Sequence, residues 1–439
     1  MRLNREFRAQ SKRPMNLLLL GGGGREHALA WKISQSKKCS SLFIAPGNAG
    51  TSAFGENLPV EPTDFQAVRK ACLDNDIHMV VVGPEEPLVK GIVDFFLSDE
   101  SIRHIPVIGP SASAARLEGS KAFSKQFMIK HGIPTAAYKE FDADHFSEGS
   151  EYLKAHALPI VLKADGLAAG KGVIICNSHI EAMAEFELML QQDKFGAAGH
   201  RVVVEEFLDG IELSVFVLTD GDHYVLLPEA KDYKKIGEGD KGPNTGGMGA
   251  VSPVPFADNE FMLKVKERII DPTIRGLKAE GIEYRGFIFI GLIKVDDEPM
   301  VIEYNCRMGD PETEVVVPRL KNDLVDLFQA VADKKLSEKT IEMDPRIAAT
   351  MVAVSRGYPG SYEKGYPITG LDVKYEESII FHAGTKMEGK TVVTNGGRVL
   401  CVTSYAGSLQ DAIRKSMVVL TRIDFEGIYF RRDIGYEFL

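Results

Sequence analysis

A short apolar run that leads into four glycines and a helix-forming segment constrains the fold of this chain more than any other stretch. The run is Asn16 to Leu20, the glycines are residues 21–24, and the helix-forming residues are 28–33. Strand, glycine turn and helix together open a doubly wound α/β domain. We therefore predict a parallel sheet whose ligand-binding edge carries the loops at strand ends. Further strand-like runs end in small-residue loops at 42–51, 78–87 and 106–110.

The glycine turn favours an anion site, because its backbone N–H groups can approach a ligand at the N-terminus of the following helix. A tight turn without a ligand is the simpler alternative. A dinucleotide site, as in an NAD(P)-dependent oxidoreductase, fits less well. Glu26 or His27 stands where the third glycine of G-x-G-x-x-G would be, and the run 42–44 is not followed by a ribose-binding acid.

Length and charge narrow the class of protein. A chain of 439 residues is too long for a single hydrophobic core, and about 150 residues per domain suggests roughly three domains. The net charge of −10 argues against nucleic acid or an anionic membrane as a partner, since both favour a basic surface. No apolar run approaches the roughly 18 residues of a transmembrane helix. Five scattered cysteines without a C-x-x-C pair fit a reduced compartment, so we expect a cytoplasmic protein.

The residues before Met15 are basic and lack the apolar core of a secretory signal. An upstream-start extension explains them most simply, and a transit-like segment is the alternative. We predict a disordered extension over residues 1–14.

A glycine-rich hairpin is predicted over residues 159–176, where two apolar strands flank a loop. Lys163 lies in the first strand, and Gly170 and Lys171 lie in the loop, as in a flap that covers phosphates. The loop is not a Walker A motif, because it is one residue short and Gly172 replaces the Ser or Thr that would hold magnesium. A surface hairpin without a ligand is the alternative. Upstream, Lys121 and Lys125 share one face of a predicted helix.

The run from Val301 to Glu314 predicts a metal and phosphate site. Glu303, Asn305 and Arg307 are spaced two residues apart, so an extended backbone places all three on one face. A carboxylate and an amide oxygen beside a guanidinium suit Mg²⁺, whose remaining ligands are phosphate oxygens and water. Glu303 and Asn305 are therefore the candidate metal ligands, with Mn²⁺ as an alternative ion.

A strand, a turn and a second strand are predicted over residues 201–215. Backbone groups at the strand exit can pair with the edge of an adenine, and Glu212 just beyond can hold ribose hydroxyls. The exit residues are Glu205, Glu206, Phe207 and Leu208. A long polar loop at 237–248 follows the pair Lys231 and Asp232, and loops of this length are usually functional or mobile.

The order of lysine helix, glycine hairpin, strand-exit acid and metal strand resembles the ATP-grasp ligases. The finer pattern is similar to the phosphoribosylamine–glycine ligase family, from about Asn16 to the end of the chain. Seven separated motifs in order are more specific than any single one. They lie at 23–28, 46–51, 83–85, 163–173, 231–234, 244–249 and 305–312.

This resemblance implies a fold and a reaction. The fold is mixed α/β and α+β, with a doubly wound domain over 15–115, an ATP-grasp domain over 116–340 and a small mixed-sheet domain over 341–439. A flap subdomain occupies about 135–205. The implied reaction joins glycine to 5-phosphoribosylamine, with ATP going to ADP and phosphate through a glycyl phosphate, in purine biosynthesis.

The resemblance also implies roles for single residues. Arg307 and Asp232 would hold the carboxylate and the ammonium of glycine, with Lys231 beside them as a catalytic residue. The metal ligands would be Glu303 and Asn305. The ATP-binding residues would be Lys125, Lys163, Gly170, Lys171, Glu205, Glu206, Phe207, Leu208 and Glu212. The phosphoribosylamine-binding residues would be Gly24, Asn48, Gly50 and Glu85.

Another ATP-grasp carboxylate–amine ligase, or a carboxylase subunit acting on a different acid, is the alternative function. A catalytically silent nucleotide sensor is disfavoured because Glu303, Asn305 and Arg307 are all present. Glu314 and Glu86 depart from residues common in the family. We expect small-molecule substrates, no nucleic-acid or membrane partner, and a monomer or weak homo-oligomer.

Overall fold

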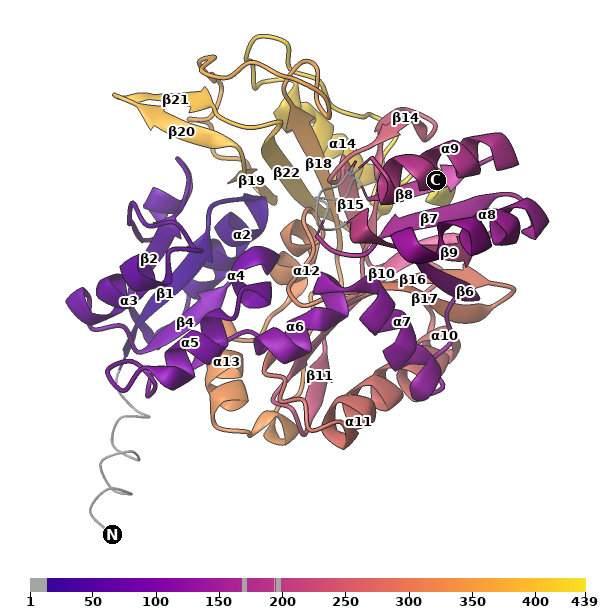
Figure 1. The fold of residues 1–439 in the computed structure, drawn as a ribbon. Helices are drawn as coiled ribbons and strands as arrows, with labels where there is room; N and C mark the ends of the chain where they lie inside the picture. The colour runs from indigo at the N-terminus through magenta and orange to yellow at the C-terminus, as the bar shows by residue number, and fades with distance from the viewer. Residues whose placement is uncertain (1–13, 168–171, 193, 195–198) are drawn as a thin grey trace.

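The computed structural model describes residues 14–167, 172–192, 194 and 199–439. Apart from Pro14, the extension predicted over 1–14 lies outside the described residues. Figure 1 shows the parallel sheet of the first hundred residues on one side of the molecule and the antiparallel sheets of the later residues on the other. No helix in the described part of the chain combines the length and the apolar composition that crossing a bilayer requires.

The first sheet is parallel and has the order β3-β2-β1-β4-β5. The central strand β1 pairs in parallel with β2 and β4, and Leu17 to Leu20 are fully buried. Strands of a parallel sheet read as continuous apolar runs because helices cover both faces. The strands are β1 (Met15–Gly21), β2 (Cys39–Pro46), β3 (Glu56–Asn57), β4 (Met79–Val82) and β5 (Val107–Ile108), and the helices are α2 (Gly24–Ile33), α3 (Phe65–Asp74), α4 (Glu85–Val89) and α5 (Ile92–Ser98). The loops after β1, β2 and β4 therefore meet at one edge, as predicted.

The glycine-rich hairpin belongs to a four-stranded antiparallel sheet of order β6-β9-β7-β8. Two helices pack on it around Phe141, Leu153 and Phe186, which are buried. The strands are β6 (Tyr138–Asp142), β7 (Ile160–Ala164), β8 (Val173–Cys176) and β9 (Arg201–Glu206), and the helices are α8 (Phe146–Ala155) and α9 (His179–Leu190). Before this sheet come α6 (Ala112–Gly119) and α7 (Lys121–Lys130).

The predicted metal residues lie on an edge strand of a second antiparallel sheet, of order β11-β10-β16-β17. Tyr304 points into its core, whereas Glu303 and Asn305 alternate to the other face. The strands are β10 (Ile211–Thr219), β11 (Tyr224–Leu226), β16 (Gly286–Val295) and β17 (Glu298–Asn305). The helices α10 (Asn259–Val265) and α11 (Asp271–Ala279) lie beneath it in Figure 1.

The last sheet, of order β12-β15-β18-β22-β19, joins strands that are distant in the sequence. Its first two strands, β12 (Lys231–Asp232) and β15 (Gly249–Ser252), precede the metal strand. Its other strands, β18 (Ile347–Val354), β19 (Ser378–His382) and β22 (Arg398–Ala406), follow it, and α14 (Leu409–Leu420) packs on them. The helices α12 (Thr313–Arg319) and α13 (Leu324–Ala332) connect the two parts.

The polar loop predicted at 237–248 contains regular structure. β13 (Lys235–Gly237) and β14 (Lys241–Asn244) form a hairpin whose turn residue Asp240 accepts a hydrogen bond of 2.7 Å from buried Arg431. The stabilising arginine lies in the C-terminal segment, so the loop residues alone do not reveal the hairpin.

Candidate active site

A cleft of about 170 Å³ separates the two antiparallel sheets. Among the described residues that line it, four are cations and four are carboxylates. The cations are Lys121, Lys125, Lys163 and Arg307, and the carboxylates are Glu85, Glu118, Glu205 and Glu303. The structure thus brings six of the predicted charged site residues together from α4, α7, β7, β9, β17 and the segment after β17, and their roles stay predictions.

Two lysines share one carboxylate at the inner wall of the cleft. The Nζ atoms of Lys125 on α7 and Lys163 on β7 lie 3.1 Å and 2.9 Å from Oε2 of Glu205 on β9. Lys125 also donates to Thr135 Oγ1 at 2.8 Å, and Lys163 donates to the Ile302 carbonyl at 3.2 Å. Burial lowers the pKa of Lys125 to about 8, although Glu205 opposes this. These ammonium groups are therefore fixed, and they face a space that phosphate oxygens could occupy.

Glu303 and Asn305 lie side by side at the end of β17, where Asn305 Nδ2 donates to Glu303 Oε1 at 3.4 Å. Burial opposes ionisation of Glu303, but Lys234, Lys163 and Lys121 outweigh it and lower the pKa of this carboxyl. In the described part of the chain no group of three or more His, Cys, Asp or Glu side chains could hold a metal by itself. One ionised carboxylate and one amide oxygen fit Mg²⁺, which commonly takes its other ligands from phosphates and water.

Arg307 follows the metal strand and is held by two carboxylates. Its Nε lies 3.2 Å from Glu85 Oε2, its Nη2 lies 2.8 Å from Glu118 Oε1, and its Nη1 donates to the Met308 carbonyl. Burial alone would lower the pKa of Arg307, but Glu118 and Glu85 raise it, so the guanidinium stays charged. Burial and Glu118 raise the pKa of the Cys306 thiol, which donates to Glu118 Oε2 at 3.0 Å.

A smaller cavity adjoins the cleft through Ile302 and Glu303. It brings together Glu212 and Asp232, and Lys234 donates to Glu212 Oε2 at 2.6 Å. Burial raises the pKa of Asp232, and Lys234 opposes this. The nearby Glu312 accepts a hydrogen bond from Ser214, and burial together with Asp232 raises its pKa to about 7. The cavity is rich in carboxylates and is suited to a cationic group.

Four of the predicted ATP and glycine residues that the structure describes lie outside the lining of both cavities. Lys231 Nζ forms an ion pair of 2.7 Å with Glu437 and lies 4.1 Å from the ring centre of Tyr233. Phe207 and Leu208 follow the end of β9 and do not line the cleft formed by the described residues. The Glu206 side chain accepts the Ala137 N–H at 2.8 Å. Gly170 and Lys171 lie outside the described residues.

The predicted phosphoribosylamine residues lie at the loop edge of the parallel sheet. Asn48 accepts the N–H of Gly50 at 2.8 Å and donates to the Gly22 carbonyl at 2.9 Å, so it fixes the loop after β2 against the loop after β1. A Cβ atom added at Gly24 would overlap the Glu314 carboxyl, and one added at Gly50 would overlap His27. Glycine therefore permits close packing of α2 against α12 at Gly24, and of the loop after β2 against α2 at Gly50.

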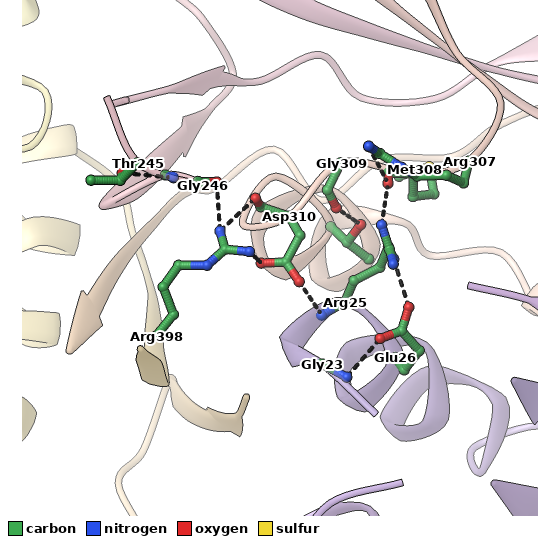
Figure 2. A network of polar contacts seen from close by, with 12 residues as sticks. Gly23, Arg25, Glu26, Thr245, Gly246, Arg307, Met308, Gly309, Asp310 and Arg398 are labelled. Carbon is green, nitrogen blue, oxygen red and sulfur yellow. Dashed lines mark hydrogen bonds and ion pairs between the residues drawn. The ribbon is translucent and has the colours of Figure 1, made fainter. Parts of the chain in front are cut away.

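The turn after the metal strand is held from two sides (Figure 2). Asp310 Oδ2 accepts the backbone N–H of Arg25 on α2 at 3.2 Å. On the other side, Arg398 on β22 forms an ion pair of 2.9 Å with Asp310 Oδ1 and donates to the carbonyls of Asp310 and Gly246 at 2.7 and 2.6 Å. The end of the metal strand is thus tied to both the first and the last sheet.

Sequence reasoning missed several partners in this network. Glu118, Lys234 and Arg25 each hold a predicted site residue or its neighbouring turn, and Glu312 lies close to Asp232. Glu118 is 188 residues from Cys306, whose N–H and S–H it accepts, so no local pattern joins them.

Two antiparallel sheets that face each other across a lysine-lined cleft, with a carboxylate and amide pair on one edge strand, define the ATP-grasp class of enzyme. Family models of phosphoribosylglycinamide synthetase match the chain in three parts: the N domain at 15–118, the ATP-grasp domain at 119–313 and the C domain at 348–437. The chain belongs to the phosphoribosylamine–glycine ligase family, which confirms the resemblance stated from the sequence.

Relatives support this assignment along almost the whole chain. The phosphoribosylamine–glycine ligase of Vibrio cholerae is 46% identical over 427 residues, which cover 96% of this chain and 98% of the relative. That of Escherichia coli K12 is 46% identical over 428 residues, with the same two coverages. The crystal structure of the Thermotoga maritima phosphoribosylamine–glycine ligase is 36% identical and superposes with a TM-score of 0.82, covering 95% of this chain and 99% of that one. A biotin carboxylase domain from Hydrogenobacter thermophilus, 16% identical with a TM-score of 0.72, shares the fold.

Proposed function

We propose that this protein is an ATP-dependent carbon–nitrogen ligase that joins glycine to 5-phosphoribosylamine. The products are glycinamide ribonucleotide, ADP and phosphate. One observation carries the proposal: in a chain that matches this ligase family over nearly its whole length, Lys125, Lys163, Glu303, Asn305 and Arg307 line a single cleft. This set combines cations for phosphate, oxygen ligands for a metal, and a guanidinium for an acid.

The proposed chemistry activates a carboxylate. A carboxylate is a poor electrophile, so transfer of the γ-phosphoryl group to glycine makes an acyl phosphate with a good leaving group. The amine of phosphoribosylamine then forms the C–N bond as the C–O bond to phosphate breaks. Such a catalyst mainly positions its substrates and neutralises charge, and needs no nucleophilic side chain. Lys125 and Lys163 supply that charge from two fixed directions.

Glu303 and Asn305 would hold Mg²⁺, with Mn²⁺ as an alternative, close to the lysines. When bound, the ion neutralises charge on the phosphate oxygens during transfer. Glu303 and Asn305 fit such an ion because the Glu303 carboxyl is ionised and the Asn305 amide lies beside it.

Glycine would bind with its carboxylate on Arg307 and its ammonium near Asp232. The carboxylate-rich cavity around Asp232 supports the second contact, because an ammonium there gains counter-charges. The glycine-rich edge around Gly24, Asn48, Gly50 and Glu85 would take phosphoribosylamine.

The adenine would pair with the backbone at 205–208 and the ribose with Glu212, while Gly170, Lys171 and Lys231 are assigned by family resemblance alone. We also propose a cytoplasmic enzyme that acts as a monomer or weak homo-oligomer.

A direct assay tests this function. Purified protein is mixed with ATP, magnesium, glycine and freshly made phosphoribosylamine, and ADP release is followed by a coupled reaction. Release should require both glycine and the amine. Equal release without glycine, or with alanine or β-alanine in its place, would overturn the assignment.

A further inference from the structure

Glu85 is placed differently from every other charged residue of the cleft. It begins α4, immediately after β4 and the Gly83-Pro84 turn, at the ligand edge of the parallel sheet. Among the described residues it is the one cleft-lining side chain that comes from the first hundred residues. Its carboxylate therefore lies where the proposed amine site meets the proposed acyl phosphate site.

The four carboxylates of the cleft are not equally available. Oε2 of Glu205 is bound by two lysines, and Glu303 belongs to the proposed metal pair. Glu118 is only 6% exposed and accepts from Arg307, the Cys306 backbone and the Cys306 thiol. Glu85 is 33% exposed, and its contact with Arg307 is the one ion pair it makes within the described residues. Glu85 is thus the carboxylate with both solvent access and a single exchangeable partner.

Arg307 can release Glu85 without losing its own position. Its Nη2 stays on Glu118 at 2.8 Å and its Nη1 stays on the Met308 carbonyl, whereas the Nε contact to Glu85 is the longer ion pair at 3.2 Å. A substrate carboxylate that approaches Arg307 competes with Glu85 for the same guanidinium. Binding of the acid would therefore free the Glu85 carboxylate.

We propose that Glu85 is the proton acceptor for the attacking amine, and that Arg307 holds it until the carboxylate substrate binds. This inference rests on the proposed ligase function. In the step, the nitrogen lone pair forms the bond to the acyl carbon, the carbon–oxygen bond to phosphate breaks, and the phosphate leaves with that electron pair. The amine N–H proton passes to Glu85, which then returns it to phosphate or water.

The charges around Glu85 suit this role. Burial disfavours its ionisation, but Arg307 and Arg25 outweigh this and lower the pKa, so the carboxylate is ionised and able to accept a proton. Glu118 is the facing acid, on the far side of the guanidinium. When a substrate carboxylate takes the place of Glu85 on Arg307, Glu85 loses part of this stabilisation and becomes a stronger base.

Rapid-quench kinetics of Glu85→Gln, with all substrates present, test the proposal. The amide keeps the shape but cannot take a proton. We expect a burst of about one ADP per active site at the wild-type rate, followed by turnover reduced about 10²-fold or more, the usual range for loss of a general base. The control is Glu86→Gln, the next residue on α4, whose ion pair with Lys90 is exposed and which should leave both phases unchanged.

Two outcomes would overturn the proposal. Turnover within threefold of wild type would show that Glu85 takes no essential proton. An ADP burst slowed as much as turnover would show that Glu85 acts only by positioning Arg307. Glu85→Asp, which keeps a carboxylate, should restore part of the turnover and the acid limb of the pH–rate profile that Glu85→Gln loses. If Glu85→Gln has a lower melting temperature than Glu86→Gln, the activity of Glu85→Asp decides whether the carboxylate accepts the proton. Failure of the wild-type protein to form product would instead refute the proposed function itself.

Discussion

Glu205→Gln tests whether the shared carboxylate holds the two cleft lysines. The substitution keeps the size of the side chain and removes the charge that Lys125 and Lys163 approach at 3.1 and 2.9 Å. All three side chains are nearly buried, with exposures of 2%, 6% and 4% for Lys125, Lys163 and Glu205. Removing one partner of a buried ion pair typically costs about 3–5 kcal/mol.

Proton loss limits the cost at Lys125. Its pKa is already lowered to about 8. At pH 7 the substitution can lower this pKa by at most about one further unit, which corresponds to ~1.4 kcal/mol, before the lysine loses its proton instead. The remaining cost falls on Lys163, and the amide oxygen can still accept one hydrogen bond. We therefore expect the free energy of unfolding to fall by about 2–4 kcal/mol at pH 7.

Urea unfolding followed by circular dichroism measures this difference. The folded pKa of Lys125 lies below its ordinary value of 10.5, so above pH 8 the folded protein holds this lysine neutral. The difference between wild type and Glu205→Gln should therefore shrink as the pH rises from 7 to 9.5. The control is Glu148→Gln, which removes an exposed pair with Lys139 and should cost less than about 1 kcal/mol. A loss below 1 kcal/mol for Glu205→Gln, or one independent of pH, would refute the reasoning.

Three further variants probe the metal pair, the buried acid Glu314 of α12 and the turn after the metal strand. Glu303→Ala removes one of two proposed metal ligands and should abolish turnover in the ADP assay with an unchanged circular dichroism spectrum; retained activity would mean the metal strand is misassigned. Glu314→Gln should have a higher melting temperature than wild type at pH 8 and the same melting temperature at pH 4. Burial and Asp310 raise the pKa of Glu314, so the stability of the wild type falls as the pH rises above the ordinary pKa of 4.5. Equal melting temperatures at pH 8 would contradict this. Arg398→Met leaves the Asp310 carboxylate without its guanidinium and should cost about 3–5 kcal/mol in urea unfolding; a loss under 1 kcal/mol would show that the turn is held by other contacts.

Local patterns in the sequence were enough to predict parts of the fold. The leucine run before Gly21 predicted β1, because a strand covered on both faces must be apolar throughout. The alternation of Glu303, Asn305 and Arg307 predicted a shared face, and all three line the cleft. The apolar strands around Lys163 predicted the hairpin β7–β8. In each case the decisive residues lie close together in the sequence, the widest span being from Ile160 to Cys176.

The partners of those residues could not be predicted in the same way. Arg307 contacts Glu85 across 222 residues, and its other acid, Glu118, carries no local mark of that role. Lys231 follows the family pattern, yet its side chain pairs with Glu437 near the end of the chain. Only the folded structure shows whether such a charged side chain faces solvent, a distant acid or a ligand. The roles assigned to the individual site residues and the domain limits stay predictions.

The last sheet, whose strand pairs are all antiparallel, has a consequence for dissecting this protein. Because β15 pairs with β18, and Tyr233 belongs to the same buried cluster as Val399 and Leu409, strands from residues 231–252 share one core with residues 347–420. A chain cut near residue 340 would leave β15 with an open hydrogen-bonding edge and an uncovered apolar face, which invites intermolecular strand pairing. Truncation after the ATP-grasp region should thus yield aggregation rather than a smaller working unit, and the last hundred residues are best treated as part of one cooperative folding block.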